Sequence, residues 1–139
     1  MKRENRFVFY LLSFTWGLLW TVIGLLTALV IVIVYRKEVL VVRHQGRLRI
    51  HFKERNFGGA SIGVVIITSG GFTSPRLVNH ELGHTIQSAR FGPLFIPLIA
   101  IPSGIRYQYR KRTKKPLKTM YDDIWFEGQA TRLGSRYFN

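Results

Sequence analysis

The sequence predicts a membrane-associated α+β protein of one domain. The 29 residues from Phe7 to Tyr35 contain no charged side chain, which is typical of a membrane segment. Short runs of alternating or β-branched residues follow and indicate a small β-sheet. A capped helical pattern then begins at Ser74, and another helical pattern ends the 139-residue chain. Strands and helices therefore follow one another in blocks, as in α+β proteins.

Composition excludes several kinds of site. The chain has no cysteine, so a disulfide framework, a cysteine-based zinc finger, an iron–sulfur cluster and a thiol nucleophile are excluded. The 21 Lys and Arg residues against 7 Asp and Glu give a net charge of +14, which indicates an anionic partner such as nucleic acid or anionic lipid. Because the chain also has a long uncharged run, lipid is favoured over nucleic acid.

Residues 1–35 are expected to form the membrane segment, and residues 36–139 the remaining domain. At 1.5 Å per residue the uncharged run makes a helix of about 43 Å, longer than the roughly 30 Å hydrocarbon core. It ends in the bulky, charged sequence Val34-Tyr35-Arg36-Lys37, unlike a cleaved signal peptide. A tilted transmembrane helix and a re-entrant hairpin broken at Gly17 and Gly24 both remain open. Basic residues are more numerous after the segment than before it, so the domain is expected in the cytoplasm.

The strand-like runs predict a hairpin and a third, more buried strand. Residues 39–43 and 47–52 flank a His44-Gln45-Gly46 turn, and the second run alternates apolar with basic side chains. Residues 61–68 are mostly Ile and Val. The small residues Gly58-Gly59-Ala60 precede them and have two readings: a tight turn into a core strand, or a strand edge that an extended ligand approaches closely.

A helix and an apolar loop are expected next. Ser74 caps the helix and Pro75 occupies its first position. The helix is expected to end near Gly92-Pro93. Residues 91–105 carry no charge but contain three prolines, so they are predicted to form an apolar loop that faces the membrane.

A basic loop and a final helix complete the chain. Arg106 to Lys118 include seven basic side chains, for which anionic lipid headgroups are the expected partner. A solvated loop and nucleic-acid binding are the alternatives, and the neighbouring membrane segment makes nucleic acid the least favoured. The final helix is expected over residues 121–136, with Asp122 and Asp123 at its positive end.

The sequence His80-Glu81-Leu82-Gly83-His84 contains the residue types of a metal site. Residues four apart lie on one face of a helix, so both imidazoles can bind one metal ion while Glu81 lies beside them. Zn²⁺ accepts nitrogen and carboxylate ligands and lowers the pKa of bound water to about 7. The motif predicts His80 and His84 as zinc ligands and Glu81 as a catalytic base.

The third zinc ligand can be sought by elimination. No histidine follows His84, and the carboxylates that follow it are Asp122, Asp123 and Glu127. Glu127 precedes Gly128 and comes shortly before a further small residue, which would let its helix approach the motif helix closely. Glu127 is therefore the expected third ligand.

The motif, followed by a glutamate some forty residues later, resembles the gluzincin class of zinc metalloproteases. The segments 58–63, 79–88, Gly92-Pro93-Leu94 and Ile101-Pro102-Ser103 are similar to small bacterial membrane-associated proteins of this class. Glu127-Gly128-Gln129-Ala130-Thr131 is similar to the Glu-x-x-Ala-Asp signature of membrane-bound gluzincins, but Thr131 stands where that signature has Asp. The usual carboxylate partner of a zinc-bound histidine is therefore missing, and Asp123 is a candidate substitute.

The resemblance implies a zinc-dependent endopeptidase in the bacterial inner membrane with its catalytic part in the cytoplasm. Glu81 would act as the general base, without a covalent intermediate. A protein or peptide substrate is expected to bind along Gly59, Ala60 and Ser61. The sequence offers three candidates for stabilising the oxyanion and does not choose among them: Tyr107, Tyr121 and Arg132.

Two other functions remain open. A site-2-type intramembrane protease would use an aspartate, Asp122 or Asp123, as third ligand, although the charged residues 106–118 between the ligands fit poorly with burial in lipid. A zinc-binding membrane protein without activity is the other alternative. Glu81 argues against it, because zinc binding alone does not require that residue.

Overall fold

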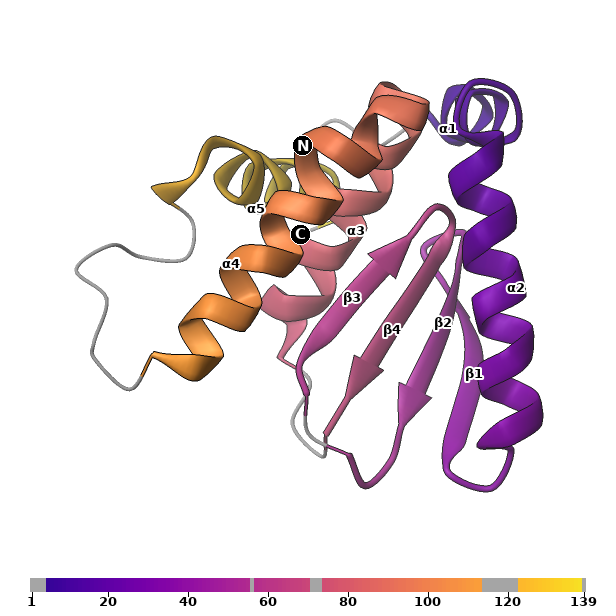
Figure 1. The fold of residues 1–139 in the computed structure, drawn as a ribbon. Coiled ribbons are helices and arrows are strands. Elements are labelled where there is room, and N and C mark those ends of the chain that lie inside the picture. Colours follow the sequence, from indigo (N-terminus) through magenta and orange to yellow (C-terminus); the bar gives the residue numbers. More distant parts are fainter. Residues whose placement is uncertain (1–4, 56, 71–73, 114–122, 139) are drawn as a thin grey trace.

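The computed structural model describes residues 5–55, 57–70, 74–113 and 123–138, and it confirms the α+β class (Figure 1). In chain order the elements are α1 (Arg6–Phe14), α2 (Leu18–Val34), β1 (Val39–His44), β2 (Arg47–Phe52), β3 (Gly59–Ile62), β4 (Val65–Ser69), α3 (Pro75–Phe91), a 3₁₀ turn (Gly92–Leu94), a π-helical turn (Ile96–Ala100), α4 (Ile101–Arg112) and α5 (Trp125–Phe138).

The four strands form one mixed sheet in the order β1-β2-β4-β3. The predicted hairpin is confirmed as the antiparallel pair β1 and β2, whereas β2 and β4 are parallel. The prediction of a single strand over residues 61–68 is wrong. Gly63, with φ of 59°, turns the chain there, so β3 and β4 form a second antiparallel pair. This turn leaves β3 at one edge of the sheet.

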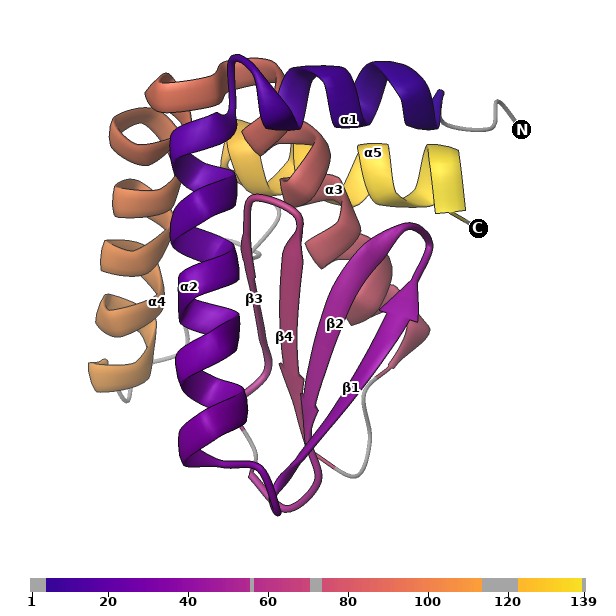
Figure 2. The same ribbon diagram turned by 90° about the vertical axis from the view of Figure 1, so that its right-hand side faces the viewer.

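Helices cover both faces of the sheet: α2 lies on one face and α3 on the other (Figure 2). Alternate residues of β4 contact the two layers, as the pleat requires. Val65 and Ile67 belong to the core that includes Ala28 of α2. Ile66 packs instead against Val78 and Leu82 of α3. The sheet therefore holds the helix with the His-Glu-Leu-Gly-His motif in a fixed position.

The N-terminal segment is two helices, α1 and α2, that meet at 90°. In the described part of the chain, no single helix is long and apolar enough to cross a membrane; two bent helix pairs, α1 with α2 and residues 75–94 with 96–112, pass that test only when taken together. The buried side of α2 consists of Thr21, Gly24 and Ala28. A Cβ at Gly24 would clash with the carbonyl of Ile62, so this glycine lets α2 lie directly against β3.

Residues 91–105 do not form the predicted loop, and residues 106–112 do not form part of a basic loop. The chain continues from α3 through the 3₁₀ and π-helical turns into α4, with a bend of 120°. Pro93, Pro97 and Pro102 each stand in the first two positions of one of these helical segments, where no backbone N–H is needed. The prolines therefore start new helices rather than prevent them. Residues 114–118 of the predicted basic loop lie outside the described residues.

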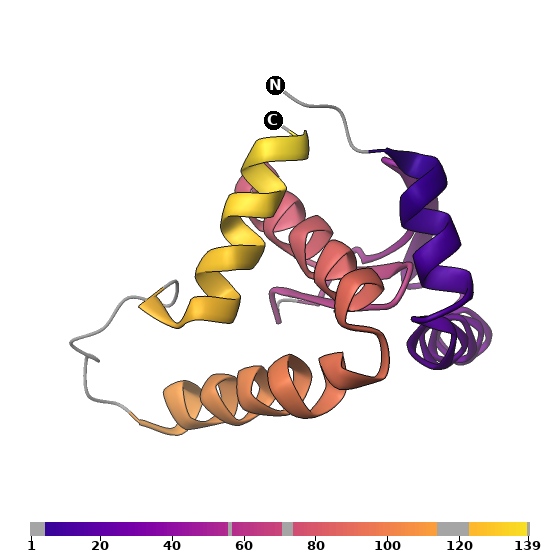
Figure 3. The same ribbon diagram turned by 90° about the horizontal axis from the view of Figure 1, so that it is seen from above.

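The final helix is confirmed, although α5 begins at Trp125 rather than at residue 121. It packs closely against α3, and Figure 3 shows the two helices side by side. Two glycines allow this approach, because a Cβ at Gly83 would clash with the carbonyl of Ala130, and one at Gly134 with the carbonyl of Asn79. This close packing brings residues of α5 to the motif on α3.

Candidate metal centre

His80 and His84 of α3 and Glu127 of α5 form a group that could hold a metal ion. His80 Nε2 lies 3.1 Å from His84 Nε2, and each of these nitrogens lies 3.1 Å from Glu127 Oε2. The two imidazole rings are perpendicular, with centroids 4.7 Å apart. The Glu127 side chain is fully buried and His80 is partly exposed, so the group is accessible from one side.

A glutamine fixes the orientation of the His84 ring. Gln87 Nε2 donates hydrogen bonds to the Phe126 carbonyl and to Gln129 Oε1, both at 2.8 Å. Gln87 Oε1 therefore faces His84 Nδ1, at 2.7 Å, and can only accept a hydrogen bond there. His84 Nδ1 must carry the proton, and in the neutral ring His84 Nε2 then carries a lone pair.

With a neutral His84 ring, two hydrogen-bond acceptors, His84 Nε2 and Glu127 Oε2, consequently face each other, and His80 Nε2 lies 3.1 Å from both. The lone pair of His84 Nε2 faces the Glu127 carboxylate and the second imidazole at 3.1 Å. Acceptors this close repel one another unless a cation lies among them. A metal ion is such a cation, and neutral imidazole with carboxylate is a common ligand set for divalent metals.

The electrostatics of the group also favour a cation. Burial alone would raise the pKa of Glu127, but hydrogen bonds with His80 and His84 outweigh burial and lower its pKa well below the usual range. Without a metal ion, a proton on His84 Nε2 can take the place of that cation: burial would lower the pKa of His84, but the hydrogen bond that the protonated ring donates to Glu127 and the charge of Glu81 raise it instead. An anionic Glu127 that faces positive charge is thus the favoured state.

Two hydroxyl groups support the ligands from outside. Thr131 Oγ1 lies 2.8 Å from His80 Nδ1, in the place where a carboxylate is expected from the resemblance. Ser103 of α4 donates a hydrogen bond to Glu127 Oε1 and leaves Oε2 directed at the histidines. Asp123 is exposed and does not belong to the ligand group, and Asp122 lies outside the described residues.

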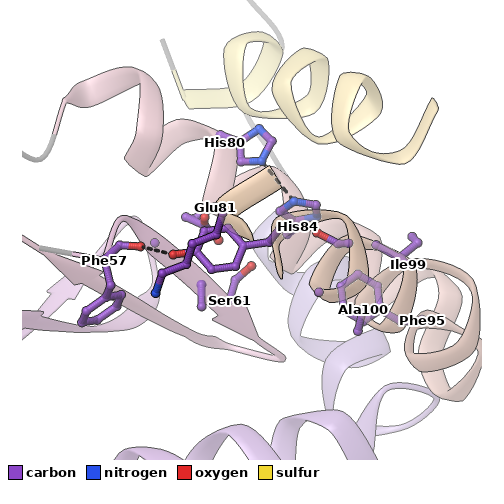
Figure 4. A pocket seen from close by; sticks show the side chains of 14 residues that line it. Phe57, Ser61, His80, Glu81, His84, Phe95, Ile99 and Ala100 are labelled. Carbon is purple, nitrogen blue, oxygen red and sulfur yellow. Dashed lines mark hydrogen bonds between the residues drawn. The ribbon is translucent and has the colours of Figure 1, made fainter. Parts of the chain in front are cut away.

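A cleft of about 470 Å³ opens beside the two histidines (Figure 4). Its walls come from the start of β3, the motif on α3 and the segment that leads into α4: Phe57, Gly59, Ala60, Ser61, His80, Glu81, His84, Phe95, Ile99, Ala100, Ser103, Gly104, Tyr107 and Lys111. All three residues predicted to bind substrate therefore line the cleft that contains the motif.

Glu81 is a buried carboxylate at the wall of this cleft. Burial raises its pKa, while the two histidines and a hydrogen bond with Ser61 act in the opposite direction. A Cβ at Gly59 would lie 2.7 Å from Glu81 Oε1, so the absence of a side chain there makes room for the carboxylate. Gly59 therefore leaves space for the Glu81 side chain, a role that the sequence did not predict.

Sequence reasoning missed Ser103, Gln87 and the apolar cleft wall of Phe95 and Ile99. Gln87 stands three residues after His84, a spacing at which helical side chains meet, so this contact was open to prediction. The contact of Ser103 was not, because residues 91–105 were expected to form an apolar loop that faces the membrane. Of the three candidates for oxyanion stabilisation, Tyr107 lines the cleft, Arg132 is exposed on α5, and Tyr121 lies outside the described residues.

No protein-family model, no curated protein and no solved structure matches this chain.

Proposed function

We propose that the chain is a membrane-anchored, zinc-dependent endopeptidase. One observation carries the proposal: two imidazole nitrogens and a carboxylate oxygen converge at 3.1 Å, with a further buried carboxylate, that of Glu81, in the same cleft. A metal site for storage or structure needs no such additional carboxylate. Three protein ligands with one accessible side is the pattern of catalytic rather than structural zinc.

The ligand spacing suits zinc. Ligand bonds of about 2.0–2.1 Å in tetrahedral geometry place the ligand atoms about 3.3 Å apart. The observed 3.1 Å is close to this value. When bound, zinc supplies Lewis acidity, which polarises a carbonyl and lowers the pKa of a coordinated water.

The proposed reaction adds one water across a peptide bond. Glu81 accepts a proton from the attacking water, the water oxygen bonds to the carbonyl carbon, and the C–N bond breaks. Glu81 then passes the proton to the leaving nitrogen, so that a carboxylic acid and an amine result, the acid gives its proton to the amine to leave a carboxylate and an ammonium group, and the base is regenerated. Tyr107, whose hydroxyl donates to the Phe57 carbonyl at 3.4 Å, is the candidate in the cleft for stabilising the oxyanion.

The edge strand β3 provides a place for an extended substrate. Within the described residues β3 pairs with β4 alone, so its outer edge has backbone groups to offer. Gly59 and Ala60 allow close approach of a peptide backbone. A substrate added to this edge would pass Glu81 and the two histidines.

The activity is testable without a known substrate. The purified chain, loaded with zinc in detergent, is incubated with solubilised bacterial membrane proteins, and new N-termini are identified by mass spectrometry. We expect new termini that disappear with a chelator and return with zinc. Termini that appear equally with and without the chelator, or none at all from the zinc-loaded chain, would contradict the proposal.

Ser103 is expected to hold Glu127 in the orientation that zinc requires. Ser103→Ala removes the hydrogen bond to Oε1 of a fully buried carboxylate. Loss of such a supporting partner typically lowers metal affinity about 10-fold to 100-fold. Zinc affinity is measured by competition with a chelator of known affinity, and Ser135→Ala, an exposed serine on α5, is the control. Equal affinity of the two variants would remove Ser103 from the site.

A further inference from the structure

The outward surface of α2 is apolar along its whole length. Only the small side of this helix, Thr21, Gly24 and Ala28, is buried. Its large apolar side chains that are exposed are Leu18, Leu19, Val22, Ile23, Leu25, Leu26, Leu29, Val30, Ile33 and Val34. No charged residue occurs between Leu18 and Val34. A helix that is apolar on its outer side as well as its inner side is typical of a lipid environment.

The segment that leads into α4, together with the first half of α4, presents a second apolar surface next to the cleft. Leu94, Leu98, Ile101 and Ile105 are between 45% and 65% exposed. Ile101 and Ile105 each follow directly after a residue that lines the cleft, Ala100 or Gly104, so they lie about 100° farther round the helix. The apolar surface of α4 therefore borders the mouth of the cleft.

Both helices become basic at the same end of the molecule, the lower end in Figure 1. The exposed Arg36 and Lys37 follow α2 directly, and Lys111 and Arg112 lie in the last turn of α4. Basic side chains at the end of an apolar helix are attracted to anionic lipid headgroups. The uncharged length of α2 followed by a basic end points to an anionic bilayer as its partner. In α4 the exposed Ile101 and Ile105 lie in the first half, and Arg106, Arg110, Lys111 and Arg112 make the rest of the helix basic.

The cleft borders α4 and β3, and α2 packs against the same strand. The contact of α2 with β3 is at Ile62, and α4 lines the cleft that β3 borders. The cleft wall beside His84 is apolar, with Phe95 and Ile99 both buried. An unwound segment in lipid must find partners for its backbone N–H and C=O groups, and the edge of β3 that pairs with no other described strand can supply them.

We infer that α2 and the apolar surface formed by Leu94, Leu98, Ile101 and Ile105 contact the hydrocarbon of an anionic bilayer, with the basic second half of α4 at its headgroups, and that the substrate is an apolar segment of a membrane-embedded polypeptide. The segment binds as an extended strand along β3 with its side chains against the apolar wall. The choice of substrate rests on the proposed peptidase function, whereas the contact with lipid does not.

The contact with lipid is tested by fluorescence of single labels. Because the chain contains no cysteine, one cysteine can be introduced and labelled with an environment-sensitive dye in vesicles of phosphatidylcholine and phosphatidylglycerol. Labels at Leu26→Cys and Ile105→Cys are expected to be blue-shifted and protected from a water-soluble quencher. A label at Ser135→Cys, on α5, is the control and is expected to be quenched. If the Ile105 label is quenched as strongly as the Ser135 label, the inferred contact of α4 with lipid is wrong. If the Leu26 label is quenched as strongly as the Ser135 label, the inferred contact of α2 with lipid is wrong.

The substrate class is tested with two probes in the same vesicles. One is a single-span peptide with an apolar segment interrupted by a central Gly-Pro pair, and the other is reduced, water-soluble casein. We expect the zinc-loaded chain to cut the embedded peptide at least about ten times faster, because the bilayer concentrates it at the cleft. Faster cleavage of casein would overturn the inferred substrate and leave the peptidase function standing. Cleavage of neither probe would count against the peptidase function itself, with the label results deciding separately on lipid contact.

Discussion

The double variant His80→Ala/His84→Ala is expected to bind no zinc, whereas the wild-type chain binds about one ion per chain. The two imidazoles supply two of the three ligand atoms, and a single buried carboxylate at Glu127 cannot hold zinc against water. Zinc is measured by elemental analysis after dialysis. Thermal unfolding gives a second readout, because zinc bound to the folded wild-type chain raises its midpoint and should not raise that of the variant.

The two remaining histidines of the chain provide a matched control. His44 ends β1, and His51 of β2 contacts Thr68 within the sheet; neither lies in the ligand group. The variant His44→Ala/His51→Ala loses the same number of imidazoles and should retain the full zinc content. If the His80/His84 variant also retained one zinc ion per chain, the metal would bind elsewhere, and the assignment of His80 and His84 as ligands would be wrong.

The ligand group could be predicted because its signals are local in the sequence. Two histidines four apart on a capped helix must share a face, and the capping of Ser74 and Pro75 was visible without any tertiary information. Glu127 could be predicted as the third ligand by elimination, because few carboxylates follow His84 in the chain. The small residues Gly128 and Ala130 indicated close helix packing. The packing is close, and the glycines whose contacts show it are Gly83 and Gly134.

The far wall of the cleft could not be predicted in the same way. Three prolines in an uncharged stretch indicated a broken loop, but each proline begins a helical segment, where its missing N–H costs nothing. That difference places Ser103 at the ligand group, which the expected loop did not predict, and Tyr107, already a candidate for oxyanion stabilisation, in the wall of the cleft. The prediction of one strand over residues 61–68 was wrong for a similar reason. Gly63, with positive φ, divides an apolar run that otherwise has no turn signal.

Glu81→Gln is expected to lower peptide hydrolysis by about two to four orders of magnitude with zinc content unchanged. Glutamine has nearly the volume of glutamate, so it fits the space that Gly59 leaves, but it cannot accept the proton from water. Glu81 is not one of the three converging ligands, so zinc should remain bound. Activity is measured as new N-termini or as cleavage of the embedded peptide, and zinc by elemental analysis on the same sample.

Glu127→Gln makes the same chemical change as Glu81→Gln, but it is expected to lose zinc rather than only activity. A neutral amide replaces the anionic ligand, so zinc affinity should fall by at least about 100-fold, more than for the loss of a supporting residue. Activity should then return in part when zinc is added in excess, which it cannot do for Glu81→Gln. Asp123→Asn, an exposed carboxylate just before α5, should change neither quantity. Loss of zinc in Asp123→Asn with full zinc in Glu127→Gln would favour an aspartate-liganded site, and full activity in Glu81→Gln would refute the proposed base whatever the ligands are.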